Sequence, residues 1–267
     1  MAGRRLAFLG PAPLSPPSRI LILAPHPDDE VVACGIAALR ARNAGAEIFT
    51  LYLTTGVPPR ELLWPRQRRK YPELVTRRRE EAIEAAPLVA VKPMGFLEIP
   101  SRQLILHLDA ATVAVERAVD ETAAECLWVP AFEGAHQDHD AANALAAQFR
   151  GRLDVWEFAA YNFAGGRVQS NRFADTRGGL VELHLNHEER ALKRRALALF
   201  TSERGNLAHI KITEEAYRPL LQHDYAAPPH AGKLFRERFH WVPFRHPRVD
   251  FTPSAEIYAA LGGWAQR

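Results

Sequence analysis

The chain has 267 residues, enough for one large domain or two small ones, and its 47% hydrophobic and 24% charged residues are ordinary for a globular protein. A net charge of +3 does not indicate nucleic-acid binding, and no stretch reaches the roughly 18 apolar residues of a membrane span. The two cysteines, Cys34 and Cys126, lie in apolar surroundings. We therefore expect buried thiols rather than a disulfide, and a cytoplasmic location.

The first 18 residues are rich in proline and contain one short apolar run at residues 6–9, after two arginines. That run is too short for the hydrophobic region of a signal peptide. We therefore expect residues 1–18 to form an extended arm.

From residue 20 to residue 160, short apolar or alternating runs take turns with segments of helical periodicity. The expected strands cover residues 20–24, 47–53, 95–99, 126–129 and 153–160. The expected helices cover residues 31–43, 73–86, 109–123 and 139–150, and a long loop is expected at 54–72. Because helices connect the strands, the pattern predicts an α/β fold with a mainly parallel sheet flanked by helices.

The last third of the chain is less regular. A strand is expected at residues 180–185 and a helix at 188–200, and the remainder, rich in proline, histidine and arginine, is expected to cap the sheet edge. No linker or internal repeat divides the chain. We therefore predict one domain over residues 1–267, with an irregular C-terminal elaboration from about residue 165.

Two turns rich in potential metal ligands follow apolar runs. Residues 25–30 read Pro-His-Pro-Asp-Asp-Glu and come directly after the first predicted strand. About 110 residues later, residues 136–140 read His-Gln-Asp-His-Asp and follow the apolar run at 126–130. In α/β folds, chemistry is usually located where strands end and helices begin. The two turns could therefore converge on one metal ion.

Taking His26, Asp29 and His139 as ligands gives a His₂Asp set, which suits Zn²⁺ with a fourth position open for water. Structural zinc sites are usually closed by four ligands, mostly cysteines, but neither of the two cysteines here has Cys-x-x-Cys spacing. We therefore expect one catalytic zinc ion per chain.

The neighbouring polar residues are candidates for proton transfer. Asp28 lies beside the first ligands and is expected to act as general base toward the attacking water. His136 has two open roles, to face the developing oxyanion or to protonate the leaving amine. Asp138 is expected to hold the His136 ring in one tautomer. The structural alternative is that Asp28 or Asp29 only caps the following helix, but two such turns after apolar strands favour the functional interpretation.

The two motifs, in this order and at this spacing, resemble those of the LmbE/PIG-L family of zinc-dependent N-acetylglucosaminyl deacetylases. The resemblance extends through Gly35, Thr55-Gly56 and residues 78–82, and it fades after about residue 160. It implies a Rossmann-like fold and hydrolysis of the acetamide of an amino sugar, typically N-acetylglucosamine in a larger conjugate.

The resemblance also implies roles for single residues. The family's zinc ligands fall on His26, Asp29 and His139. Asp28 matches the general base, and His136 matches the histidine that steadies the oxyanion or protonates the amine. Arg78 matches an arginine associated with substrate binding.

The chain departs from the family pattern at three positions. Some sugar deacetylases of this family carry a tyrosine two residues before the first histidine of the second motif, where this chain has Gly134. That tyrosine's contribution is therefore missing or supplied from elsewhere. Phe200 and Glu203 stand where relatives carry histidine and glutamine. These departures bear on the identity of the substrate rather than on the metal chemistry.

A dense basic run lies between residues 66 and 79. Its last three arginines lead into Glu80, Glu81 and Glu84, which indicates i,i+4 pairing on a solvated helix, and the alternative is recognition of an anionic part of the substrate. We expect Arg78 to reach the pocket, and Arg77 and Arg79 to point to solvent or to the glutamates of their own helix.

Four functions compete on these observations. The leading one is a zinc-dependent N-deacetylase acting on a small amino-sugar conjugate. The second is an amidase acting on a different amide, such as a thiol–sugar conjugate. A two-metal phosphoesterase would need more carboxylates than the two motifs supply. A non-catalytic metal- or glycan-binding module is disfavoured because Asp28 is retained beside the ligands. No nucleic-acid partner or membrane span is expected, and the sequence is compatible with an oligomer.

Overall fold

The computed structural model describes residues 18–244 and 246–267, so residues 1–17 of the expected arm lie outside it. Its main sheet has seven strands in the order β3-β2-β1-β4-β5-β9-β8. The strands are β1 (Arg19–Ala24), β2 (Glu47–Tyr52), β3 (Lys92–Phe96), β4 (Cys126–Pro130), β5 (Asp154–Phe158), β8 (Val181–His184) and β9 (Glu214–Pro219). A separate two-stranded sheet pairs β6 (Tyr161–Asn162) with β7 (Gln169–Ser170).

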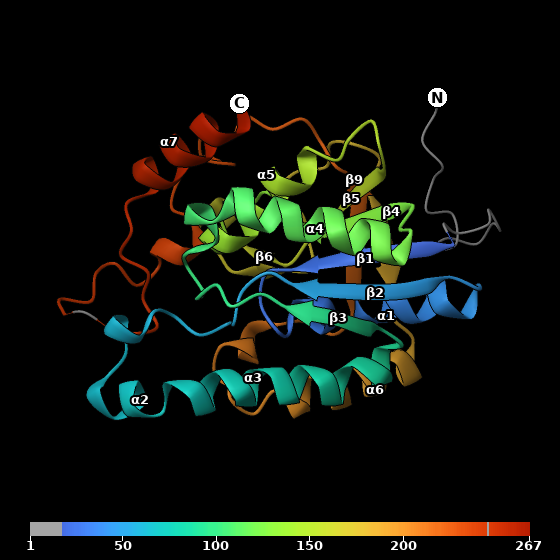
Figure 1. Cartoon of the computed structure of the whole chain (residues 1–267), viewed down its shortest axis with the longest axis horizontal. Coiled ribbons are helices and arrows are strands. Elements are labelled where there is room, and N and C mark those ends of the chain that lie inside the picture. Colours follow the sequence, from blue (N-terminus) through green and yellow to red (C-terminus); the bar gives the residue numbers. More distant parts are fainter. Residues whose placement is uncertain (1–17, 245) are drawn as a thin grey trace.

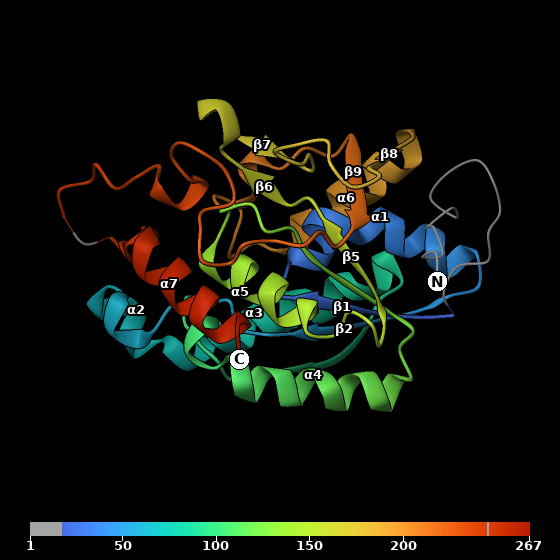
Figure 2. The same cartoon turned by 90° about the horizontal axis from the view of Figure 1, so that it is seen from above.

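Helices cover both faces of this sheet (Figures 1 and 2). They are α1 (Asp29–Asn43), α2 (Pro65–Arg69), α3 (Tyr71–Ala85), α4 (Leu108–Thr122), α5 (Gln137–Ala147), α6 (His187–Leu199) and α7 (Ser254–Ala265). The predicted fold class, a mainly parallel sheet flanked by helices, is confirmed. None of the helices in the described part of the chain is long and apolar enough to cross a membrane.

Strand β1 explains why both faces are covered, because its side chains alternate between two apolar clusters. Ile20 and Ile22 point into the cluster shared with α1, α3 and α6, whereas Leu21 and Leu23 point into the cluster shared with α4, α5 and α7. All four are fully buried. Burying such a side chain is worth about 1.5–3 kcal/mol, so this strand anchors the centre of the fold.

The order in which the chain adds strands reverses at the centre of the sheet, because β2 and β3 lie on one side of β1 and β4 and β5 lie on the other. β1 pairs with β2 on one side and with β4 on the other, and both pairings are parallel. The segments that leave the carboxyl ends of β1 and β4 therefore run to opposite faces. This arrangement opens a crevice between them, which is where open α/β sheets bind their ligands.

The C-terminal part is more regular than the predicted cap. β9 joins the main sheet antiparallel to β5, and β8 pairs antiparallel with β9 at the sheet edge. The segment from residue 220 onward leads into α7, which packs against α5. The elaboration therefore completes the sheet and also covers one of its faces.

Candidate metal centre

Hydrogen bonds stabilise the turn between β1 and α1, and its two acidic side chains do not cap the helix. The carbonyl of His26 accepts hydrogen bonds from the backbone N–H groups of Asp28 and Asp29. The Asp28 side chain makes no cap hydrogen bond to α1, although Asp28 is the residue that precedes the helix. The Asp29 carboxylate instead accepts from the backbone N–H of His26, with N and Oδ2 2.8 Å apart. Capping therefore does not explain this acidic pair.

The turn between β4 and α5 has a histidine as its cap. His136 precedes α5, and its Nδ1 accepts a hydrogen bond from the backbone N–H of Asp138 at 3.1 Å. Since Nδ1 accepts, the neutral ring carries its proton on Nε2. His139 lies in the first turn of α5 and is fully buried. His136 therefore faces the pocket, whereas His139 is buried inside the protein.

The two turns meet in a cluster of three potential ligands. Asp29 Oδ2 lies 3.2 Å from Nδ1 of His26, and Asp29 Oδ1 lies 3.2 Å from Nε2 of His139. The two ring nitrogens, His26 Nδ1 and His139 Nε2, are 3.3 Å apart. The structure therefore brings together the three side chains that the sequence pointed to as zinc ligands.

These separations fit a tetrahedral metal. Zinc bonds of about 2.0–2.1 Å at tetrahedral angles separate neighbouring ligand atoms by about 3.3 Å. Nitrogen and carboxylate oxygen are donors that zinc accepts. Burial alone would raise the pKa of Asp29, but the two imidazoles beside it hold that pKa well below the usual range, so the carboxylate is available as a ligand. The residues present therefore fit one zinc ion.

Asp138 is buried beneath this cluster and makes four hydrogen bonds. Its Oδ2 accepts from His26 Nε2 at 3.1 Å, from Ser101 Oγ at 3.2 Å and from the backbone N–H of Arg102 at 2.6 Å, and Oδ1 accepts from the backbone N–H of Leu104 at 3.2 Å. Burial opposes its ionisation, but the histidines and these donors lower the pKa of Asp138 to about 2.

The Asp138 carboxylate therefore holds the ring of His26, whereas the sequence analysis expected it to orient His136. Nδ1 of His136 is 3.5 Å from the carboxylate and accepts from the backbone N–H of Asp138 instead. A carboxylate that fixes the far nitrogen of a ligating histidine is the usual support of a zinc site. This contact strengthens the choice of His26 Nδ1 as a ligand atom.

A second trio of possible ligands, His26, His136 and Asp138, also lies close together. The atoms of this trio that would bind a metal are already engaged in hydrogen bonds, however. Nδ1 of His136 accepts the hydrogen bond from Asp138, and the Oδ2 atom of Asp138 accepts three. The trio is thus a hydrogen-bonded network, and the first cluster is the better metal site.

Asp28 faces the pocket and contacts Arg78. Nη2 of Arg78 lies 3.2 Å from Asp28 Oδ2, and Nη1 lies 3.1 Å from Glu203 Oε1. Burial and the neighbouring Asp29 raise the pKa of Asp28, while Arg78 opposes that rise. A Cβ on Gly56 would lie 2.8 Å from the guanidinium, so the glycine after β2 makes room for Arg78. Arg78 is only 3% exposed and joins two acids at the pocket wall.

The other arginines of this run behave differently. Arg77 bonds to Glu81 of its own helix and to Thr201. Arg79 does not line the pocket and pairs with the exposed Glu98, which lies after β3, rather than with a glutamate of its own helix.

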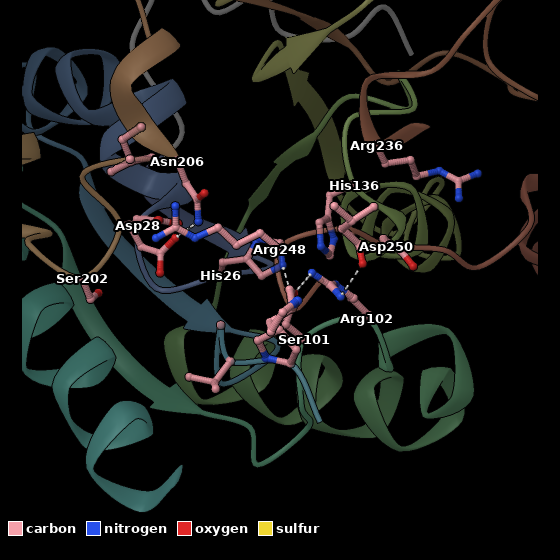
Figure 3. A pocket seen from close by; sticks show the side chains of 18 of the residues that line it. His26, Asp28, Ser101, Arg102, His136, Ser202, Asn206, Arg236, Arg248 and Asp250 are labelled. Atoms are coloured by element: carbon pink, nitrogen blue, oxygen red, sulfur yellow. Dashed lines mark hydrogen bonds between the residues drawn. The ribbon is translucent and has the colours of Figure 1, made fainter. Parts of the chain in front are cut away.

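A pocket of about 860 Å³ opens over the cluster (Figure 3). His26, Asp28, Asp29, Arg78 and His136 all line it, whereas His139 and Asp138 lie beneath its wall. The volume lies within the usual range for small-molecule sites. The pocket can therefore place a small substrate next to the cluster of potential metal ligands and next to Asp28 at the same time.

Tyr161 and Glu133 take part in the site in ways that the sequence pattern did not show. The ring of Tyr161 lines the pocket, with its centroid 5.3 Å from that of His139. The buried Glu133 carboxylate accepts from the backbone N–H groups of Ala160 and Tyr161 and so fixes this turn. A side chain does not fit at Gly134, because a Cβ there would lie 2.7 Å from Leu234. Tyr161 thus places a phenol ring in the pocket wall although position 134 carries none.

Part of the chain is similar in sequence to known proteins. Residues 21–149 match the family model of PIG-L, GlcNAc-PI de-N-acetylase. The 2'-N-acetylparomamine deacetylase of Streptomyces fradiae is 32% identical over 139 residues, which cover 45% of this chain and 48% of that enzyme. The match thus spans about half the length of this curated relative.

Two solved structures share the fold. A deacetylase from the biosynthesis pathway of teicoplanin aligns with a TM-score of 0.59 at 19% identity, over 77% of this chain and 99% of that one. The 4-carboxy-2-hydroxymuconate hydratase GalB of Pseudomonas putida KT2440 aligns with a TM-score of 0.57 at 13% identity, over 77% and 97%. Because one neighbour is a hydratase, the fold alone does not define the reaction.

Proposed function

We propose that the protein is a zinc-dependent N-deacetylase acting on an amino-sugar conjugate, because residues 21–149 match the family model of PIG-L, as the two motifs predicted. The observation that carries this proposal is the buried cluster of His26, Asp29 and His139, whose donor atoms are 3.2–3.3 Å apart below an open pocket. A relative that deacetylates an N-acetylated aminoglycoside supports the substrate class.

Different residues of the site would carry out the separate steps of amide hydrolysis. A zinc ion held by the cluster would polarise the acetamide carbonyl and lower the pKa of water. Asp28 lies at the pocket side of the cluster and is the group placed to accept the proton of the attacking water. The water oxygen bonds to the carbonyl carbon, Asp28 passes the proton on to the amide nitrogen as the carbon–nitrogen bond breaks, and acetate and a free amino sugar leave.

His136 is better placed to donate a hydrogen bond than to capture a metal. Its Nδ1 is committed to the backbone of α5, so Nε2–H is the group that can face the developing oxyanion. Burial, reinforced by the nearby His26, holds the pKa of His136 well below its usual range. Of its two open roles, stabilising the oxyanion as a neutral ring is therefore favoured over protonating the amine.

The reaction can be tested with a panel of acyl donors. Acetate and free amine should appear together from N-acetylated amino sugars and aminoglycosides, and no phosphate should be released from phosphomonoesters. Cleavage of thiol–sugar amides without cleavage of any N-acetyl amino sugar would favour the second amidase function. Binding of amino sugars without product from any donor would identify a non-catalytic glycan-binding module instead.

Replacing Arg78 by alanine should reduce kcat/KM roughly ten- to a hundredfold, because the variant loses charge-assisted hydrogen bonds at the pocket. We propose that Arg78 binds a hydroxyl or anionic group of the substrate while it holds Asp28. Arg79→Ala is the matched control, since Arg79 pairs with Glu98 away from the pocket and its loss should leave kcat/KM nearly unchanged. Thermal unfolding of both variants separates a loss of stability from a loss of activity. Equal, small effects at both positions would show that the run is only a solvated face.

A further inference from the structure

The C-terminal elaboration builds one wall of the pocket and brings arginines to it. Five arginines line the pocket in all, namely Arg78, Arg102, Arg236, Arg238 and Arg248. The lining acids are Asp28, Asp29, Glu203 and Asp250. Three of these acids are already engaged by the cluster or by Arg78, and Asp250 accepts from Gln137. The wall therefore carries more positive charge than its own acids neutralise.

Two of these five arginines are engaged by other groups of the chain itself. Arg102 donates to the carbonyls of Pro247 and Val249 and so braces the segment that carries Arg248. Arg236 donates to the carbonyl of Thr252 and to the hydroxyl of Ser254. Arg102 and Arg236 therefore serve the architecture of the pocket, and the charge of Arg78 is already shared by two acids.

Arg238 and Arg248 differ from them. Within residues 18–244 and 246–267, neither guanidinium has a carboxylate at ion-pair distance. Arg238 lies over the ring of Phe235, with its Cζ 3.3 Å from the ring centroid, and its Nε donates only to the Phe235 carbonyl. Partial burial lowers the pKa of Arg238, and no acid compensates for that burial. Its remaining N–H groups are therefore free to bind an anion.

The side chain of Arg248 extends into the pocket toward Asn206 and Asp28 (Figure 3). Its Nη1 lies 3.3 Å from the position of a Cβ on Gly205, so the loop between α6 and β9 lies close beside it. The guanidinium is exposed and makes no side-chain hydrogen bond in the described part of the chain. A ligand in the pocket would therefore meet two cations that have no carboxylate partner among the residues that the structure describes.

We propose that this wall binds an anionic group of the substrate, a phosphate or a carboxylate, through Arg238 and Arg248. Planar guanidinium groups match both anions in geometry and charge. The main site of anion recognition is then the C-terminal elaboration, because Arg78 is the one cation of the basic run at residues 66–79 that lines the pocket, and Arg77 and Arg79 pair with glutamates. This inference rests on the proposed function only in taking an amino sugar as the body of the ligand.

Calorimetric binding tests this proposal without any need for turnover. The probes are N-acetylglucosamine, N-acetylglucosamine 1-phosphate and N-acetylmuramic acid, titrated into the zinc-loaded protein. At least one anionic probe should bind ten- to a hundredfold more tightly than neutral N-acetylglucosamine, and the preferred probe distinguishes phosphate from carboxylate.

The double variant Arg238→Gln, Arg248→Gln should lose most of this preference, whereas Arg79→Gln should keep it. A preference that survives in the double variant would mean that the anion binds the metal or Arg78 instead, and it would overturn the proposal. Equal affinity for neutral and anionic probes, or no measurable binding of the anionic ones, would overturn it as well. Since the readout is affinity, failure of the deacetylation assay alone would leave this result unchanged.

Discussion

Replacing Asp28 by asparagine should lower kcat by a hundredfold or more while the metal content stays the same. Asparagine has the same shape and can still accept the hydrogen bond from Arg78, but it cannot take up a proton. General-base catalysis is typically worth a factor of about 10²–10⁴, which sets the expected range. The measurement is the rate of acetate release at saturating substrate, together with elemental analysis of the same preparation.

The Asp29→Asn variant is the matched comparison, because Asp28 and Asp29 are adjacent acids in one turn. Asp29 contacts both histidines of the cluster, whereas Asp28 contacts Arg78. We therefore expect Asp29→Asn to lose metal and Asp28→Asn to keep it. Metal loss in Asp28→Asn with retention in Asp29→Asn would show that the two roles are reversed.

Replacing His139 by alanine should remove both the bound metal and the activity. His139 is fully buried, and its Nε2 completes a set of three donors, so the variant leaves only two protein ligands. The zinc content of protein purified without added metal should fall from about one per chain to a small fraction of that, and acetate release should fall to background.

His136→Ala provides the control for this variant, because it removes a histidine from the same turn without removing a proposed ligand. It should keep the metal and lose rate. Unchanged zinc content in His139→Ala would refute the ligand assignment, and a wild-type rate in His136→Ala would refute its proposed role at the oxyanion.

The place of the metal cluster could be predicted from the sequence because the two turns follow strongly apolar runs. In a parallel sheet such runs are buried central strands, and their carboxyl ends meet at one edge. The partner of Asp138 could not be predicted in the same way. It depends on how the turn at residues 101–104 folds over the cluster, and Ser101 and Arg102 lie far from either motif in the sequence.

The two errors in the sheet have physical causes. β3 was expected at residues 95–99 but lies at Lys92–Phe96, because it is a partly exposed strand with an irregular register and the apolar Leu97 and Ile99 pack beyond its end. β9 was not expected at all, since it contains charged residues. Its buried Glu215 and Arg218 are paired with Lys193 and Glu157, and only the tertiary structure supplies those partners.

Helix α7 was not predicted from the sequence, and the reason is different. It follows Pro253 and contains Gly262 and Gly263, which weaken the helical pattern. In the structure Gly262 packs against Ala226, where a Cβ would be only 2.6 Å from the alanine Cβ, so the glycine is required by close packing. The pocket wall formed by residues 235–244 and 246–250 likewise depends on long-range contacts, which explains why the arginines that we propose to bind an anion had no sequence signal.

The central claim is that the cluster of His26, Asp29 and His139 holds a metal that makes this chain an N-deacetylase. The most direct test follows acetate release from an N-acetyl amino-sugar substrate by the protein as purified, after removal of metal with a chelator, and after addition of one equivalent of zinc. We expect activity to disappear on chelation and to return with one equivalent of zinc in the wild-type protein, but not in His139→Ala. Activity that persists in protein shown by elemental analysis to be free of metal would contradict the account.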